Sequence, residues 1–454
     1  MTVRHPDPGE VESFLKGELS SGENRRIVRN LLAAWRAYRN ELGQIWEERR
    51  LPSIFPARPV ATRDYEPAFE SLLPVLRTRA GEVARERERL PELVHCLEGW
   101  LAGPTARAPG ELLESHGGLR SWSFCEWLIE ESQRLLYVDP GRAKELAVFA
   151  VTVAGSLAPE SYGVSLIHDL QARAWAHAGR VLRVLSDLRG AEEAFATAED
   201  LIGQGTGDAL EEAGILELKA ALRRDQRRPY EAHRLLDEAI RIYRQYRDFH
   251  LVGRAFVQKG KVYGSCNELE PAIRWLRKGL GLIDPTRERY LDLAARHSLM
   301  LYLHESGRHR EARFLLKASR PELQQHGGEL LNLRLRWLEG KIHGSLGFVD
   351  KAEEALIEAR QGFIRLGVGF SAAEVSLDLA ALYAGQGRAA EMRRLSEEML
   401  SIFQSRDLHR EAIAALITFQ QAVEMERVNT QLLADLRSYL DRARKDPQLR
   451  FEPA

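Results

Sequence analysis

Small and apolar residues recur in this chain with a period of about 40 residues, and this period constrains its fold more than any other feature. The repeating anchors are Ala232, Ala272, Ala312, Ala352 and Met392, and the series extends to Leu432. A second residue precedes an anchor by twelve positions in the pairs Gly179–Ala191, Ala220–Ala232, Gly260–Ala272, Met300–Ala312, Gly340–Ala352 and Ala380–Met392. A period of this length indicates supersecondary units that stack on their neighbours.

The anchors are followed by further residues at helical spacing. Four positions after them stand Phe195, Leu236, Leu276, Leu316 and Leu356, and seven positions after them stand Ala198, Ala239, Gly279, Ser319 and Ala359. These offsets lie on one face of an α-helix. Small residues are needed where two helices of a hairpin approach closely, and the larger residue fills the space between hairpins. The pattern therefore predicts an all-α fold of stacked helical hairpins.

This pattern resembles the tetratricopeptide repeat, in which glycine and alanine stand twelve apart and are followed by a large apolar residue and a second alanine. The family's unit is about 34 residues long, so the longer unit here implies longer helices and also approaches the period of HEAT-like arrays. The internal offsets favour the tetratricopeptide type. That resemblance implies a right-handed superhelical solenoid that holds a partner protein in its groove.

The composition divides the chain into five segments. We expect a small helical module over 1–50, a proline-rich linker over 51–67, an irregular helical region over 68–120, the repeat array over 121–446 and a tail over 447–454. The first hairpin of the array is irregular. Ala143 stands near its anchor position, but it lies further from the next anchor, Ala191, than the regular period allows.

The amino-terminal module carries HP, FL, GELS and then RRIVRNLL. This order resembles the small zinc-binding anti-sigma-factor domain of bacterial regulators, in which a histidine and a following Cys-x-x-Cys bind the metal. Asn30, Trp35 and Tyr38 stand at those positions here, and His5 alone remains as a potential ligand. The resemblance therefore implies a metal-free version in which Trp35 and Tyr38 pack in place of zinc. The module is a helical cap, a contact for a sigma factor or a similar regulator, or a contact for another kind of partner.

The charges of the chain are balanced. Lysine and arginine number 65 against 66 aspartates and glutamates, which argues against nucleic acid or a membrane surface as a partner. The three cysteines are far apart and fit neither a disulfide framework nor a metal site. The amino terminus lacks a secretory pattern, and the longest apolar stretch, 146–159, is shorter than the roughly 20 residues of a membrane span. We expect a bacterial protein of the cytoplasm.

Motifs of catalysis are absent from the sequence. It contains no glycine-rich phosphate loop, no His-Glu-x-x-His and no Gly-x-Ser-x-Gly. We therefore expect a non-enzymatic protein with no catalytic residue, metal or cofactor. The histidines at scattered repeat positions, such as His304, His309 and His343, are expected to be surface or core residues.

Basic residues recur at equivalent positions of the first helix in three repeats. Arg173, Arg254 and Arg334 stand six positions before the small residue, and Arg180, Lys261 and Lys341 stand one position after it. Arg183 and Arg224 lie nearby in register, and His297 and Trp337 occupy the adjacent register. The pattern predicts a basic stripe in the groove, suited to an acidic peptide or a chain terminus. The alternative is an exposed helix face whose charges are neutralised by neighbouring glutamates.

Overall fold

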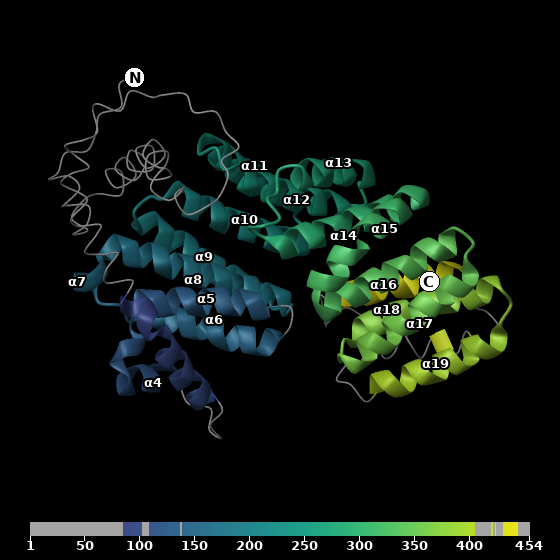
Figure 1. Ribbon diagram of the computed structural model, residues 1–454, viewed down its shortest axis with the longest axis horizontal. Helices are drawn as coiled ribbons and strands as arrows, with labels where there is room; N and C mark the ends of the chain where they lie inside the picture. The colour runs from purple at the N-terminus through teal and green to yellow at the C-terminus, as the bar shows by residue number, and fades with distance from the viewer. Residues whose placement is uncertain are drawn as a thin grey trace. The chain divides into compact units, whose positions relative to one another are not determined.

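The computed structural model describes residues 85–101, 109–136, 139–404, 419–420, 423 and 430–443. All regular secondary structure in these ranges is helical, which confirms the all-α fold of tetratricopeptide-like hairpins (Figure 1). The chain contains two compact units, Met1–Leu222 and Arg223–Ala454.

Unit 1 contains a helical segment at 85–101 followed by shorter and longer helices. Their bounds are α4 Pro109–Ser115, the 3-10 helix η1 Gly117–Leu119, α5 Trp122–Leu135, α6 Pro140–Gly155, α7 Pro159–Tyr162, α8 Val164–Val184 and α9 Leu188–Gln204. A further helix, α10 Ala209–Asp225, crosses the boundary between the units. Helices α5 and α6 form the first hairpin, and α8 and α9 form the next. The short α7 and the long α8 explain the wider spacing between Ala143 and Ala191.

Unit 2 follows the period seen in the sequence. Its helices are α11 Pro229–Gln245, α12 Phe249–Ser265, α13 Leu269–Leu280, α14 Arg289–Glu305, α15 His309–His326, α16 Gly328–Ser345, α17 Val349–Arg365, α18 Gly369–Gly385, α19 Ala389–Gln404 and α21 Thr430–Ala443. The even-numbered helices α12 to α18 are the first helices of their hairpins, and the odd-numbered helices α13 to α19 are the second helices. Three first helices begin at Phe249, Arg289 and Gly369, which are separated by whole multiples of the repeat period.

The anchors lie where the two helices of a hairpin meet. Ala191, Ala232, Ala272, Ala312 and Ala352 are fully buried. A Cβ atom added at Gly340 would stand 2.7 Å from Cγ of Leu356 and 3.2 Å from the carbonyl oxygen of Ala352. Gly260 makes the equivalent approach to Leu276 and Ala272. The glycines therefore stand at these positions because the second helix passes too close for any side chain.

The turns within hairpins repeat one backbone conformation. A residue with positive φ stands at Arg227, Asn267, Gly307, Gly347 and Gly387. These residues share the period of the anchors, so every hairpin of the series reverses direction in the same way. Glycine adopts this left-handed conformation at little cost, whereas Arg227 holds it at a φ of 59°.

Successive first helices of unit 2 pack directly on one another. Helix α12 contacts α14, α14 contacts α16, and α16 contacts α18. The second helices α15 and α17 instead stand on either side of a cavity. Successive first helices of unit 2 therefore form a continuous layer, as tetratricopeptide-type packing predicts.

Several expectations concern residues outside the described ranges. The zinc-site positions His5, Asn30, Trp35 and Tyr38, the module at 1–50, the linker at 51–67 and the tail at 447–454 all lie there. Among the helices that are described, none combines the length and apolar character needed to cross a membrane.

Candidate binding surface

Five of the residues predicted to line the groove lie on the first helices of unit 2. They are Lys261 of α12, His297 of α14, and Arg334, Trp337 and Lys341 of α16, and we call this set the basic face. All five are partly exposed. Because first helices pack on one another, residues from three successive hairpins share one surface.

His297 stands at the centre of the basic face. Burial, assisted by the positive charges of Arg334, Lys261 and Lys341, lowers the pKa of its imidazole to about 4, although a backbone hydrogen bond at Arg334 acts in the opposite direction. The ring is therefore neutral near pH 7. Its Nε2 atom is buried and has no hydrogen-bond partner in the described part of the chain. A cationic surface with a neutral imidazole at its centre is suited to an anionic group.

Trp337 is held in place by an acidic partner and an aromatic one. Its Nε1 donates a hydrogen bond of 2.6 Å to Oδ2 of Asp378, and its ring meets that of Phe363 edge-on with centroids 6.1 Å apart. The ammonium of Lys341 lies 5.9 Å from the centroid of the indole ring. Trp337 thus orders the carboxyl-terminal side of the basic face and offers a surface for stacking.

A second cluster of titratable groups adjoins the basic face along α14. Burial lowers the pKa of His304 to about 4, assisted by the charges of Lys341 and His309. Nδ1 of His304 lies 3.2 Å from Nδ1 of His309. Burial also raises the pKa of Glu305, against the charges of Lys341 and Arg437. Glu305 is thus an acidic group near Lys341 of the basic face, and sequence reasoning did not identify it.

Arg254 takes part in an ion pair within the stack. Its guanidinium lies 3.1 Å from Oε1 of Glu288 and 3.4 Å from the hydroxyl of Tyr243. Nε2 of His250 also lies 3.2 Å from the same Glu288 oxygen. Burial alone would raise the pKa of Glu288, but Arg254 and His250 hold it below its usual value. Arg254 therefore links its hairpin to the loop before α14. At this position the charge of the arginine is neutralised by a glutamate, which was the alternative to a basic stripe.

The remaining predicted residues lie beside acidic partners or in the other unit. Arg224 pairs with the adjacent Asp225 at 2.9 Å. In unit 1, Arg173 of α8 lies 3.1 Å from Glu126 and 3.5 Å from Glu211. Arg180 and Arg183 follow on the same helix and are partly exposed. The basic stripe predicted from register is thus neutralised at Arg173, Arg224 and Arg254, while five residues gather in the basic face.

The described residues contain no group of three or more histidine, cysteine, aspartate or glutamate side chains placed to hold a metal ion. Cys125 is buried, which raises the pKa of its thiol to about 12. It is therefore an unreactive core residue.

No protein-family model matches this sequence, and no curated protein matches it either. Many solved structures are similar to the chain, among them the following three. A Rap protein complexed with competence and sporulation factor has 16% identity and a TM-score of 0.47 over 79% of this chain and 99% of its own. The apo form of RapI has 15% identity and a TM-score of 0.47, and the match covers 70% of this chain and 86% of RapI. A STAND-type signal transduction ATPase with a tetratricopeptide repeat sensor, from Pyrococcus horikoshii, has 14% identity and a TM-score of 0.47. The match covers 96% of this chain and 73% of the ATPase.

Proposed function

We propose that this chain is a non-enzymatic regulatory adaptor of the bacterial cytoplasm, whose basic face binds an acidic segment of a partner protein. The observation that carries the proposal is the convergence of Lys261, Arg334 and Lys341 around His297. Three cations on two helices can engage several carboxylates of an extended peptide, and Trp337 can pack against an apolar residue beside them.

The binding experiment uses a fluorescein-labelled peptide rich in glutamate and aspartate, with fluorescence anisotropy as the readout. We expect saturable binding that weakens as salt rises, because exposed charges are screened. Reversal of Lys261 or Lys341 to glutamate should each weaken binding roughly tenfold. The matched control is Arg393→Glu, an exposed arginine on α19. Equal affinity of the wild type and both groove variants would contradict the proposal.

A finer hypothesis concerns the amino-terminal module. Residues 1–50 would sequester a sigma factor or a similar regulator, while the basic face holds or senses another partner. The competing hypothesis is a general assembly scaffold or peptide receptor with a vestigial module. Affinity capture from the native cell with mass spectrometry, comparing the full chain with one that lacks residues 1–40, separates them. Capture of a sigma factor by the full chain alone supports the first, whereas the same non-sigma partner with both chains supports the second.

A further inference from the structure

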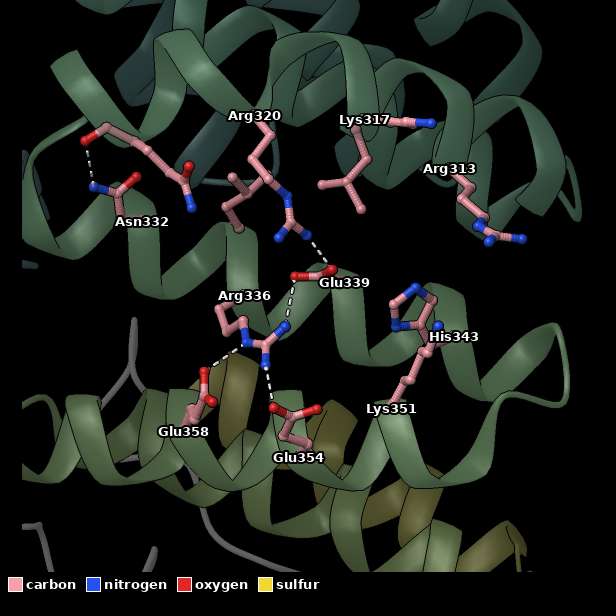
Figure 2. Close-up of a pocket in the computed structure, with 13 residues that line it drawn as sticks. Arg313, Lys317, Arg320, Asn332, Arg336, Glu339, His343, Lys351, Glu354 and Glu358 are labelled. Atoms are coloured by element: carbon pink, nitrogen blue, oxygen red, sulfur yellow. Dashed lines mark hydrogen bonds and ion pairs between the residues drawn. The ribbon is translucent and has the colours of Figure 1, made fainter.

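A cavity of about 660 Å³ lies between α15, α16 and α17 (Figure 2). The cavity and the basic face lie on opposite sides of α16. The cavity wall on α16 includes Asn332, Arg336 and His343, whereas Arg334 and Lys341 belong to the basic face. With 3.6 residues per helical turn, these two sets point in nearly opposite directions. The cavity is therefore a separate site.

One end of the cavity is electrically neutralised by the protein itself. Glu339 is paired with Arg320 and lies 2.9 Å from Arg336. Arg336 also lies 2.7 Å from Glu358 and 3.6 Å from Glu354. Figure 2 shows these side chains linked in a continuous chain of ion pairs. All three carboxylates that line the cavity are therefore already engaged by arginines.

The other end of the cavity carries three basic side chains. Arg313 and Lys317 extend from α15, and Lys351 stands at the start of α17. Within the described ranges, none of the three has a carboxylate at ion-pair distance, and Arg313 rests on the ring of Phe348 with its guanidinium carbon 4.7 Å from the centroid. Mutual repulsion of these cations would be relieved by a bound anion.

Buried polar atoms in the cavity wall lack partners. His343 is 9% exposed, and its Nδ1 is buried and has no hydrogen-bond partner in the described part of the chain. Oδ1 of Asn332, eleven residues earlier on α16, is also buried and has no hydrogen-bond partner among the described residues. An unsatisfied buried polar atom is costly, so both atoms call for a ligand group or ordered water. They stand about 16 Å apart along the helix, which is compatible with one elongated small molecule.

We propose that this cavity binds a phosphorylated small molecule, whose phosphate groups are held by Arg313, Lys317 and Lys351. The volume falls within the range of small-molecule sites, which is about 300 to 1,000 Å³. Leu316 and Leu335 are the apolar residues of a wall that is otherwise polar or charged, so an apolar ligand would leave charges desolvated. Phosphate oxygens accept several charge-assisted hydrogen bonds from lysine and arginine at once. Because the cations come from two second helices, binding also braces α15 against α17.

Isothermal titration calorimetry of the full chain with sodium pyrophosphate, at constant ionic strength, tests the proposal. We expect saturable binding with one site per chain, and sodium sulfate should bind more weakly by at least roughly tenfold. Lys317→Gln and Lys351→Gln should each raise the Kd for pyrophosphate roughly tenfold. The matched control is Lys144→Gln, an exposed lysine on α6, which should leave the Kd unchanged.

Circular dichroism would verify that each variant is folded. Absence of saturable heat with pyrophosphate would overturn the proposal, as would equal binding of sulfate or an unchanged Kd in both lysine variants. Lys341→Glu on the basic face should leave pyrophosphate binding intact, so failure here and failure of the acidic-peptide proposal are distinguishable.

Discussion

The indole of Trp337 and the carboxylate of Asp378 join two successive hairpins through a hydrogen bond of 2.6 Å between Nε1 and Oδ2. Asp378 also accepts a hydrogen bond from Arg437 of α21. Its side chain is only 10% exposed. One largely covered carboxylate therefore connects α16, α18 and α21, and it holds the aromatic residue of the basic face in position.

Removal of this connection should destabilise unit 2. Trp337→Phe keeps most of the ring but removes the donor, and we expect a loss of about 2 kcal/mol in the free energy of unfolding because the acceptor is charged and largely covered. Asp378→Asn should cost a similar amount. Urea denaturation followed by circular dichroism would measure both. The double variant should lose less than the sum of the single losses, whereas Trp337→Phe combined with the distant Arg393→Gln should be additive.

The close approach of helices at Gly340 predicts a clash on substitution. In Gly340→Ala the new methyl group would meet Leu356 and the backbone of Ala352, so we expect a loss of roughly 1 to 3 kcal/mol in unfolding free energy. Gly385→Ala, at the end of α18, is the control because its added Cβ has no atom within 4 Å. Equal stability of the two variants in urea denaturation would contradict the packing argument.

The hairpin turns allow a reciprocal pair of substitutions. Arg227 is exposed and has a φ of 59°, so Arg227→Gly should relieve backbone strain and raise the unfolding free energy by up to about 1 kcal/mol. At the equivalent Gly307, with a φ of 79°, an added Cβ finds open space. Gly307→Ala should therefore lose stability through φ alone, again by about 1 kcal/mol. Thermal unfolding of both variants would show whether each substitution stabilises or destabilises the fold, and a stabilising Gly307→Ala would refute the argument.

The depressed pKa values of His297 and His304 predict acid sensitivity. Both have a folded pKa of about 4 against an ordinary value of 6.5, so between these pH values the unfolded chain binds more protons than the folded one. The stabilisation is present above about pH 6.5 and is lost as pH falls towards 4. His297 should account for about 2 kcal/mol of the stability lost between pH 7 and pH 5, and His304 for less, because solvent screens it more.

Denaturation in urea at the two pH values tests this dependence. His297→Gln and His304→Gln should each reduce the loss on acidification, whereas His326→Gln, at an exposed position of α15, should not. Equal losses in the wild type and both variants would show that these histidines do not govern the acid response.

The repeat itself could be predicted from the sequence because its determinants are local. Gly260, Ala272 and Leu276 lie within one hairpin, and their offsets of twelve and four positions follow directly from helix geometry. The structure confirms the close contact that those offsets predict. Helical register also placed Lys261, Arg334 and Lys341 on one face, because equivalent positions of stacked first helices point the same way.

The ion-pair partners of the basic residues could not be predicted from the sequence in the same way. Arg254 meets Glu288, which is supplied by the loop after α13, the second helix of its own hairpin. Trp337 finds Asp378 on a neighbouring hairpin. Likewise, Arg336 pairs with the carboxylates that line the cavity between α15, α16 and α17. Arg313, Lys317 and Lys351 have no carboxylate at ion-pair distance in the described part of the chain.

The sequence by itself determined the helices, their pairing and the side of each helix that meets its neighbour, because a regular repeat encodes these through local spacing. Only the tertiary structure decided which basic residues are neutralised and where a cavity opens. Ion pairs depend on side chains from different hairpins meeting within a few ångströms, and the separation of α15 from α17 depends on how whole helices pack.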